Sequence, residues 1–139
     1  MKNIVFILII LFAAIPTLKA DVKKWKLEQI GFLNIDRNEK DYGGFSGLII
    51  RNAGTEALIV TDKSFFFVLE LRRDDNDILT GYSVIKKGRI LSSKGEHLNG
   101  RNTDSESIAM DANNNYFISF ESNHRIMMHT EVEGKGCLL

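Results

Sequence analysis

Four acidic residues lie at the ends of short apolar segments. Asp62 and Glu121 each end one such segment, and Asp104 and Glu106 come just before another. Clustered carboxylates repel one another unless a cation or an arginine neutralises them. Calcium accepts about six to eight oxygen ligands and favours carboxylates. We therefore predict that Asp62, Asp104, Glu106 and Glu121 hold a calcium ion.

A histidine and an arginine follow the last of these carboxylates. Arg125 could clamp a phosphate oxygen through its guanidinium fork, and His124 could donate a proton to a leaving alkoxide. A calcium-bridged phosphate ester would fit between these groups. The predicted catalytic residues are Glu106, Glu121, His124 and Arg125.

Each of these side chains also has a structural alternative. Acidic residues beside tight turns commonly cap backbone amides, which is the alternative for Asp62 and Glu121. His124 and Arg125 could form a local clasp with Glu121. The other two carboxylates could be solvated loop residues. The residue types and spacing leave these alternatives open.

Other enzyme and metal templates do not fit. The run from Asp111 through Asn113 and Asn115 resembles the start of an EF-hand loop, but Tyr116 and Ser122 occupy positions that need glycine and glutamate. The three histidines and the single cysteine lack zinc-ligand spacing. The sequence contains neither a Gly-x-Ser-x-Gly elbow nor a glycine-rich nucleotide loop.

Short β-rich segments surround the candidate site residues. They are rich in Ile, Val, Phe and Tyr, and clusters of Asn, Asp, Ser and Gly separate them, as expected of strands and turns. The predicted strands are Trp25–Ile35, Phe45–Arg51, Ala57–Asp62, Phe65–Leu71, Thr80–Leu91, Ser107–Asp111, Tyr116–Glu121 and Arg125–Thr130. The pattern predicts an all-β protein.

An internal repeat indicates how these strands are grouped. Ser46–Asp62 and Glu106–Glu121 both read as strand, polar turn, strand and terminal carboxylate, about 60 positions apart. Such repetition predicts a partial β-propeller of two to three antiparallel blades, with Asp62 and Glu121 at one rim. A β-sandwich is the alternative. Because a ring usually needs about four to eight blades, we expect the missing blades of its own propeller as a partner.

Four short motifs carry a family resemblance. Gly44–Leu48, Thr61–Asp62, Asp104–Ala109 and Phe120–Ile126 resemble, in order and spacing, motifs of the family described as the esterase-like activity of phytase. The similarity covers about Gly43 to Thr130. It implies a propeller domain from an exported bacterial protein and hydrolysis of small phosphate esters or other esters.

Two departures from the family pattern bear on catalysis. Ser107 stands where the family commonly has glycine, and Lys63–Ser64 stand where it tends to have Arg-Gly. Losing the arginine removes the better bidentate phosphate binder. The leading hypothesis is a truncated calcium-dependent ester or phosphoester hydrolase, which could be inactive alone. The alternatives are a non-catalytic propeller binding module and an inert fragment.

The first twenty residues resemble a secretory signal peptide. Lys2 precedes the apolar run Ile4–Ile15, Pro16 ends it, and Ala20 offers a cleavage site. The run is shorter than the roughly 20 residues that span a bilayer, so we expect no stable membrane insertion after cleavage, an uncleaved anchor being the alternative. The predicted organisation is a signal helix over 1–20 and a phytase-like domain over 21–139.

Net charge and cysteine content limit the classes of binding partner and the cellular compartment that we expect. Without Lys2 and Lys19 the mature chain has 16 basic and 18 acidic residues, a net charge of −2, which disfavours nucleic acid as a partner. Cys137 is the only cysteine and cannot form an internal disulfide. An exported chain without disulfides fits a bacterial periplasm or a secreted bacterial protein.

Overall fold

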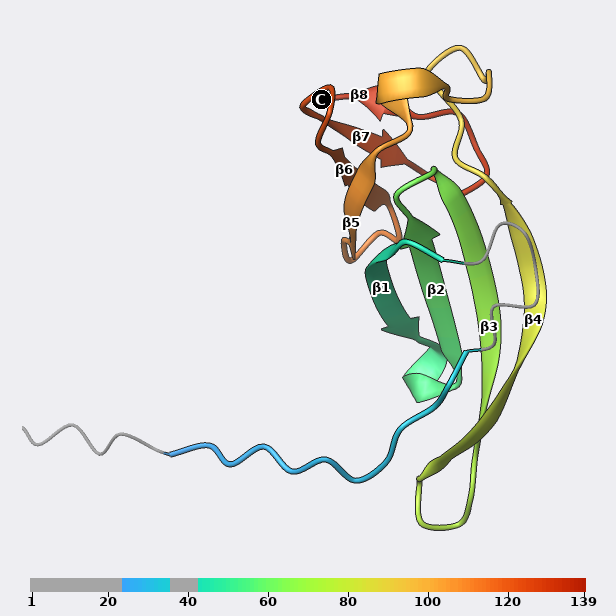
Figure 1. Cartoon of the computed structure of the whole chain (residues 1–139), viewed down its shortest axis with the longest axis vertical. Coiled ribbons are helices and arrows are strands. Elements are labelled where there is room, and N and C mark those ends of the chain that lie inside the picture. Colours follow the sequence, from blue (N-terminus) through green and yellow to red (C-terminus); the bar gives the residue numbers. More distant parts are fainter. Residues whose placement is uncertain (1–23, 36–42) are drawn as a thin grey trace, which may run out of the picture.

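Two antiparallel four-stranded sheets form the described part of the chain, which is all-β (Figure 1). The structure is a computed structural model and describes residues 24–35 and 43–139. The first sheet contains β1 (Phe45–Arg51), β2 (Glu56–Thr61), β3 (Phe65–Arg73) and β4 (Leu79–Arg89), and the second contains β5 (Ser105–Met110), β6 (Tyr116–Phe120), β7 (Arg125–His129) and β8 (Cys137–Leu138). In each sheet the strands lie in chain order, which confirms the predicted fold class and resembles two blades of a propeller.

Seven of the eight predicted strands are present, with ends shifted by no more than two residues. The strand predicted over Trp25–Ile35 is wrong, because the structure has no strand there. Apolar and polar residues do alternate in this segment, but it joins neither of the two described sheets. Conversely, the structure pairs the short strand β8 with Met127 and Met128, although the C-terminal residues show only weak patterning.

The two sheets repeat each other at the level of backbone register. Phe45 pairs with Thr61 and Gly47 with Val60, so Ser46 is left over as a β-bulge. The second sheet has the same irregularity, because the register shifts between Ser105 and Ser107 and leaves Glu106 over. A bulge redirects one side chain of a strand. The sequence repeat is therefore also a structural repeat, and Glu106 occupies the bulge of the second sheet.

A shared hydrophobic core joins the two sheets. Its buried residues come from both sheets and from the loops after β4 and β7: Leu58, Val60, Phe66, Val68, Ile90, Leu98, Ile108, Tyr116, Ile118, Phe120, Met127 and Val132. The innermost strands β1 and β5 approach closely at Gly47, where a Cβ atom would lie 2.8 Å from the Ile108 amide nitrogen. Ser46 Oγ donates to the Ser105 carbonyl at 2.6 Å, and Ser105 Oγ donates to the Thr61 carbonyl at 2.5 Å. The sheets are thus fixed against each other by packing and by hydrogen bonds.

A second core lies on the opposite face of the first sheet. Its buried residues are Ala57, Ile59, Phe67, Leu69 and Leu71. Leu33 and Ile35 of the N-terminal segment pack against it, whereas the preceding residues run away from the sheets (Figure 1). The predicted signal peptide lies outside the described residues. No helix within the described part of the chain is long and apolar enough to cross a membrane.

Candidate metal and active site

Three of the four predicted carboxylates converge in the second sheet. Asp104 comes just before β5, Glu106 sits in the β5 bulge, and Glu121 follows β6. One carboxylate oxygen of each residue lies within 4.8 Å of the others. Asp104 is half-buried, and the two glutamates are exposed. The arrangement forms an acidic cluster that is open to solvent.

Local hydrogen bonds hold this cluster in place. The Glu121 amide donates to the Asp104 carbonyl at 2.9 Å, which ties the end of β6 to the start of β5. Ser122 Oγ donates to the Asp104 carboxylate. The cluster is therefore formed by the ends of paired strands, and the bulge lets Glu106 join it.

Asp62, the fourth predicted carboxylate, comes from the first sheet. Its amide donates to the Gly44 carbonyl at 2.8 Å, which matches the bond between Glu121 and Asp104. Gly44 has φ +63°, and a Cβ atom there would overlap the Asp62 carboxylate. Asp62 Oδ1 is buried and has no hydrogen-bond partner in the described part of the chain. Burying a carboxylate oxygen without a partner is costly, so this atom is suited to a cation.

The pKa of Glu106 reflects the charge around it. Partial desolvation, and then the negative charges of Glu121, Asp104 and Asp62, raise the pKa of Glu106 above its ordinary value. Glu121 and Glu106 also lie within hydrogen-bonding reach of each other. Asp62 and Glu121 both act on Glu106, so the two repeat-equivalent residues lie at the same end of the sheets. Among the described residues, no ion pair joins Asp104, Glu106 or Glu121 to a basic side chain.

These residues fit a calcium ion. Calcium prefers several carboxylate oxygens with additional carbonyls and water. The cluster offers three carboxylates close together, and Asp62 offers an oxygen with no other partner. The donors are all oxygen, which disfavours zinc and other metals that prefer nitrogen or sulfur.

Arg125 contacts an aromatic ring and two backbone carbonyls. Its guanidinium lies 3.7 Å from the centre of the Phe120 ring and donates to the Asn102 carbonyl at 2.5 Å and the Asn123 carbonyl at 2.9 Å. Desolvation lowers the pKa of Arg125. Arg125 thus links the 3₁₀ turn η2 (Gly100–Asn102) to the β6–β7 turn. The structure does not bring it into an ion pair with Glu121 among the described residues.

His124 is exposed in the β6–β7 turn, next to the cluster in sequence. Within the described residues, no hydrogen bond joins it to the carboxylates. The sequence analysis missed two residues that shape the site, Gly44 beneath Asp62 and Ser122 beside Asp104. Both belong to the quoted motifs, but motif matching does not reveal which side chain contacts which.

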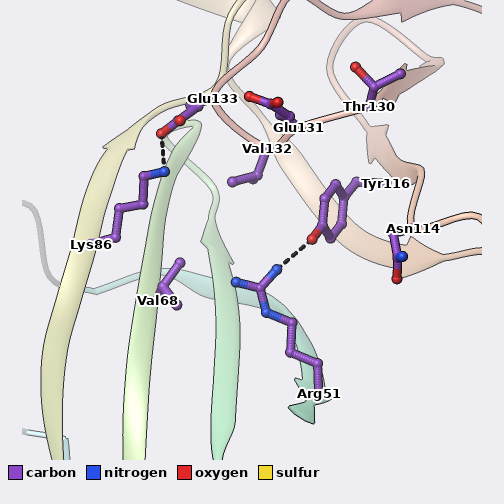
Figure 2. A pocket seen from close by; sticks show the side chains of 9 residues that line it. All are labelled: Arg51, Val68, Lys86, Asn114, Tyr116, Thr130, Glu131, Val132 and Glu133. Atoms are coloured by element: carbon purple, nitrogen blue, oxygen red, sulfur yellow. Dashed lines mark hydrogen bonds and ion pairs between the residues drawn. The ribbon is translucent and has the colours of Figure 1, made fainter.

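A separate cavity of about 200 Å³ is lined by residues of both sheets and by none of the four carboxylates. Figure 2 shows its lining side chains. Arg51 donates to the Tyr116 hydroxyl and pairs with Glu56, and Lys86 pairs with Glu133 at 2.6 Å. The basic groups of this cavity are already matched by acceptors. The cavity-lining residues therefore connect the two sheets, and their paired basic groups are poorly suited to bind an anionic ligand.

The two four-stranded sheets, with an acidic rim where they meet, define a propeller-like domain. The chain belongs to the Phytase-like family, described as esterase-like activity of phytase, whose match covers residues 40–136. This confirms the predicted resemblance and extends it at both ends. None of the curated proteins and none of the solved structures matches the chain.

Proposed function

We propose that this chain is an exported, calcium-dependent hydrolase of small phosphate esters or other esters. The observation that supports it most directly is the convergence of the carboxylates of Asp104, Glu106 and Glu121. Asp62, whose charge also raises the pKa of Glu106, adds a buried oxygen without a hydrogen-bond partner in the described part of the chain. Membership of the Phytase-like family supports the ester class of substrate.

The carboxylates have two roles in this proposal. Asp62, Asp104, Glu106 and Glu121 would hold the ion, which would supply positive charge to a substrate oxygen and to an attacking water. Glu106 is the candidate general base, because the β5 bulge places its carboxylate beside those of Asp104 and Glu121. His124, exposed beside the cluster, is the candidate proton donor to the leaving group.

A non-catalytic calcium-binding module is the second candidate. One observation favours it: two guanidinium nitrogens of Arg125 already donate to backbone carbonyls, which leaves less of this side chain for a phosphate. A propeller fold serves binding and catalysis equally well, so the fold does not decide between them.

Hydrolysis assays on the purified chain test the proposal. We expect turnover of p-nitrophenyl phosphate or p-nitrophenyl acetate with calcium, and its loss with EGTA. Glu106→Gln and Glu121→Gln should each lower the rate by at least about tenfold, as expected for loss of a general base or a ligand. Glu70→Gln, an exposed glutamate on β3, is the matched control and should have no effect.

Calorimetric titration of calcium separates the two candidates. Calcium binding without turnover of either ester, by chain shown to be folded, would contradict the hydrolase and favour the binding module. Absence of both binding and turnover would contradict both proposals.

A further inference from the structure

Each sheet has one face packed against the other sheet and one face that no second sheet covers, and Leu33 and Ile35 pack on part of this second face of the first sheet. The first sheet packs through Leu58, Val60, Phe66 and Val68, and the second sheet through residues that include Ile108, Ile118 and Met127. Register places Leu48 opposite Ile59 and Ile50 opposite Ala57, on the other face of the first sheet. It likewise places Phe117 opposite Met128 and Ser119 opposite Ile126, on the other face of the second.

We call these surfaces the β1 face (Phe45, Leu48, Ile50) and the β7 face (Phe117, Ile126, Met128). The repeat makes them counterparts of the two halves of the interface between the sheets. Leu48 corresponds to Ile108, which the second sheet contributes to the shared core. Ile126 corresponds to Phe66, which the first sheet contributes to that core.

The exposure of corresponding residues shows what each face lacks. Leu48 is 58% exposed, whereas Ile108, covered by the first sheet, is 8% exposed. Ile126 is 47% exposed, whereas Phe66, covered by the second sheet, is 1% exposed. Each face therefore has the side chains of an inter-sheet contact without the opposing sheet. Exposed apolar surface of this kind favours association.

The β1 face also contains a shallow depression. A depression of about 290 Å³ lies on it, lined by Ile35, Phe45, Ser46, Gly47, Leu48 and Ile59. Apolar side chains supply most of this lining. Its position on β1 corresponds to the part of β5 that the first sheet covers within the chain.

We propose that the β7 face of one copy of this chain packs on the β1 face of a second copy, continuing the contact seen between its own two sheets. The interface is head-to-tail, because it joins two different surfaces. Repeated head-to-tail contacts form a closed ring or an open filament. Since propellers contain about four to eight blades, two-bladed copies would close with about two to four chains.

Ser107 makes the new contact looser than the internal one. It corresponds to Gly47, where the Ile108 backbone leaves no room for a side chain. Ser107 Oγ lies on the β7 face and bonds Ser119 Oγ at 2.9 Å. We therefore expect Ser107→Gly to allow closer approach and to strengthen association.

The proposal is independent of the acidic cluster. Ser46 stands at the bulge position that Glu106 occupies in the second sheet, so the new contact would not create a second carboxylate cluster. Loss of association and loss of calcium binding are therefore separate outcomes.

Light scattering on the purified chain tests this inference. We expect a mass of two or more copies for the unchanged chain, and monomers for Leu48→Glu and for Ile126→Glu. Mixing these two variants should restore a dimer, because each keeps one intact face of the opposite kind. An interface between two identical surfaces would not be restored by mixing.

Ile85→Glu is the matched control, since Ile85 is 55% exposed on the outermost strand β4, and it should leave the mass unchanged. Circular dichroism would show that all variants remain folded. A folded, monomeric parent chain whose Ser107→Gly variant is also monomeric would overturn the proposal. So would folded Leu48→Glu and Ile126→Glu variants that still associate.

Discussion

At the scale of single residues, the site depends on a few contacts between carboxylates and their surroundings. Gly44 leaves room for the Asp62 side chain, and its positive φ suits glycine. Ser122 donates to the Asp104 carboxylate. Glu106 is held near other negative charges, which makes its protonation state sensitive to both pH and cations.

The raised pKa of Glu106 predicts a specific dependence of stability on pH. A carboxyl with a higher pKa in the folded state adds stability below its unfolded pKa and loses that contribution as the pH rises through its folded pKa. Without calcium, Glu106→Gln should therefore unfold at a higher temperature than the parent chain at pH 7. The difference should vanish near pH 4 and below, where Glu106 is protonated.

At pH 7, calcium should make the parent chain more stable than the Glu106→Gln variant. The reason is that the Glu106 carboxylate would bind calcium in the parent chain and is missing from the variant. Thermal melts in EGTA and in calcium measure both effects, and Glu70→Gln provides the control. A variant less stable than the parent chain in EGTA at pH 7 would contradict the proposed repulsion.

At the level of single elements, the strand β7 and the loop before β8 enclose a buried histidine. His129 is fully buried at the end of β7, and its Nδ1 contacts the Gly134 carbonyl at 3.1 Å. Its Nε2 has no hydrogen-bond partner in the described part of the chain and lies against Gly136. Burial lowers the pKa of His129, more than the Gly134 carbonyl raises it.

This environment predicts a loss of stability in mild acid. The unfolded state binds a proton near pH 6.5, whereas the folded state resists it. Stability should therefore be complete above about pH 6.5 and fall as the pH drops towards the lowered pKa. Urea unfolding between pH 7.5 and pH 5 measures the slope.

His129→Leu should flatten that slope, because leucine cannot take up a proton. His97→Gln changes an exposed histidine and should keep the slope of the parent chain. Equal slopes for the parent chain and the His129→Leu variant would show that another group controls the acid response.

For the molecule as a whole, the packed sheets differ from the N-terminal segment that precedes them. The sheets share one core, and the second core is covered partly by Leu33 and Ile35. The segment that leads into them carries exposed apolar residues such as Leu27 and Phe32. The signal sequence that we predict lies before this segment.

Export predicts a defined mature N-terminus. When the full chain is expressed in a bacterium, mass spectrometry of the exported fraction should find a chain that begins at Asp21. Leu18→Ala places a smaller residue at the third position before the cut and should increase the processed fraction. Recovery of the intact chain in the membrane fraction would instead support an uncleaved anchor.

Much of the architecture could be predicted from local patterns. Apolar runs separated by Asn, Asp and Gly placed seven strands, and the 60-residue repeat anticipated two similar sheets. Strand periodicity is a local property, so it reports which segments prefer to extend. It does not report which segments find a partner, and this is why the strand predicted over Trp25–Ile35 is absent.

Seven of the strands, the repeat and the acidic residues at the strand ends could be predicted from the order of the amino acids. Three contacts appear only in the folded chain: the bulge brings Glu106 to Asp104 and Glu121, the charge of Asp62 from the other sheet acts on Glu106, and Arg125 stacks on Phe120. The reason is physical: side-chain neighbours across two sheets depend on register, bulges and inter-sheet packing, which long-range contacts set.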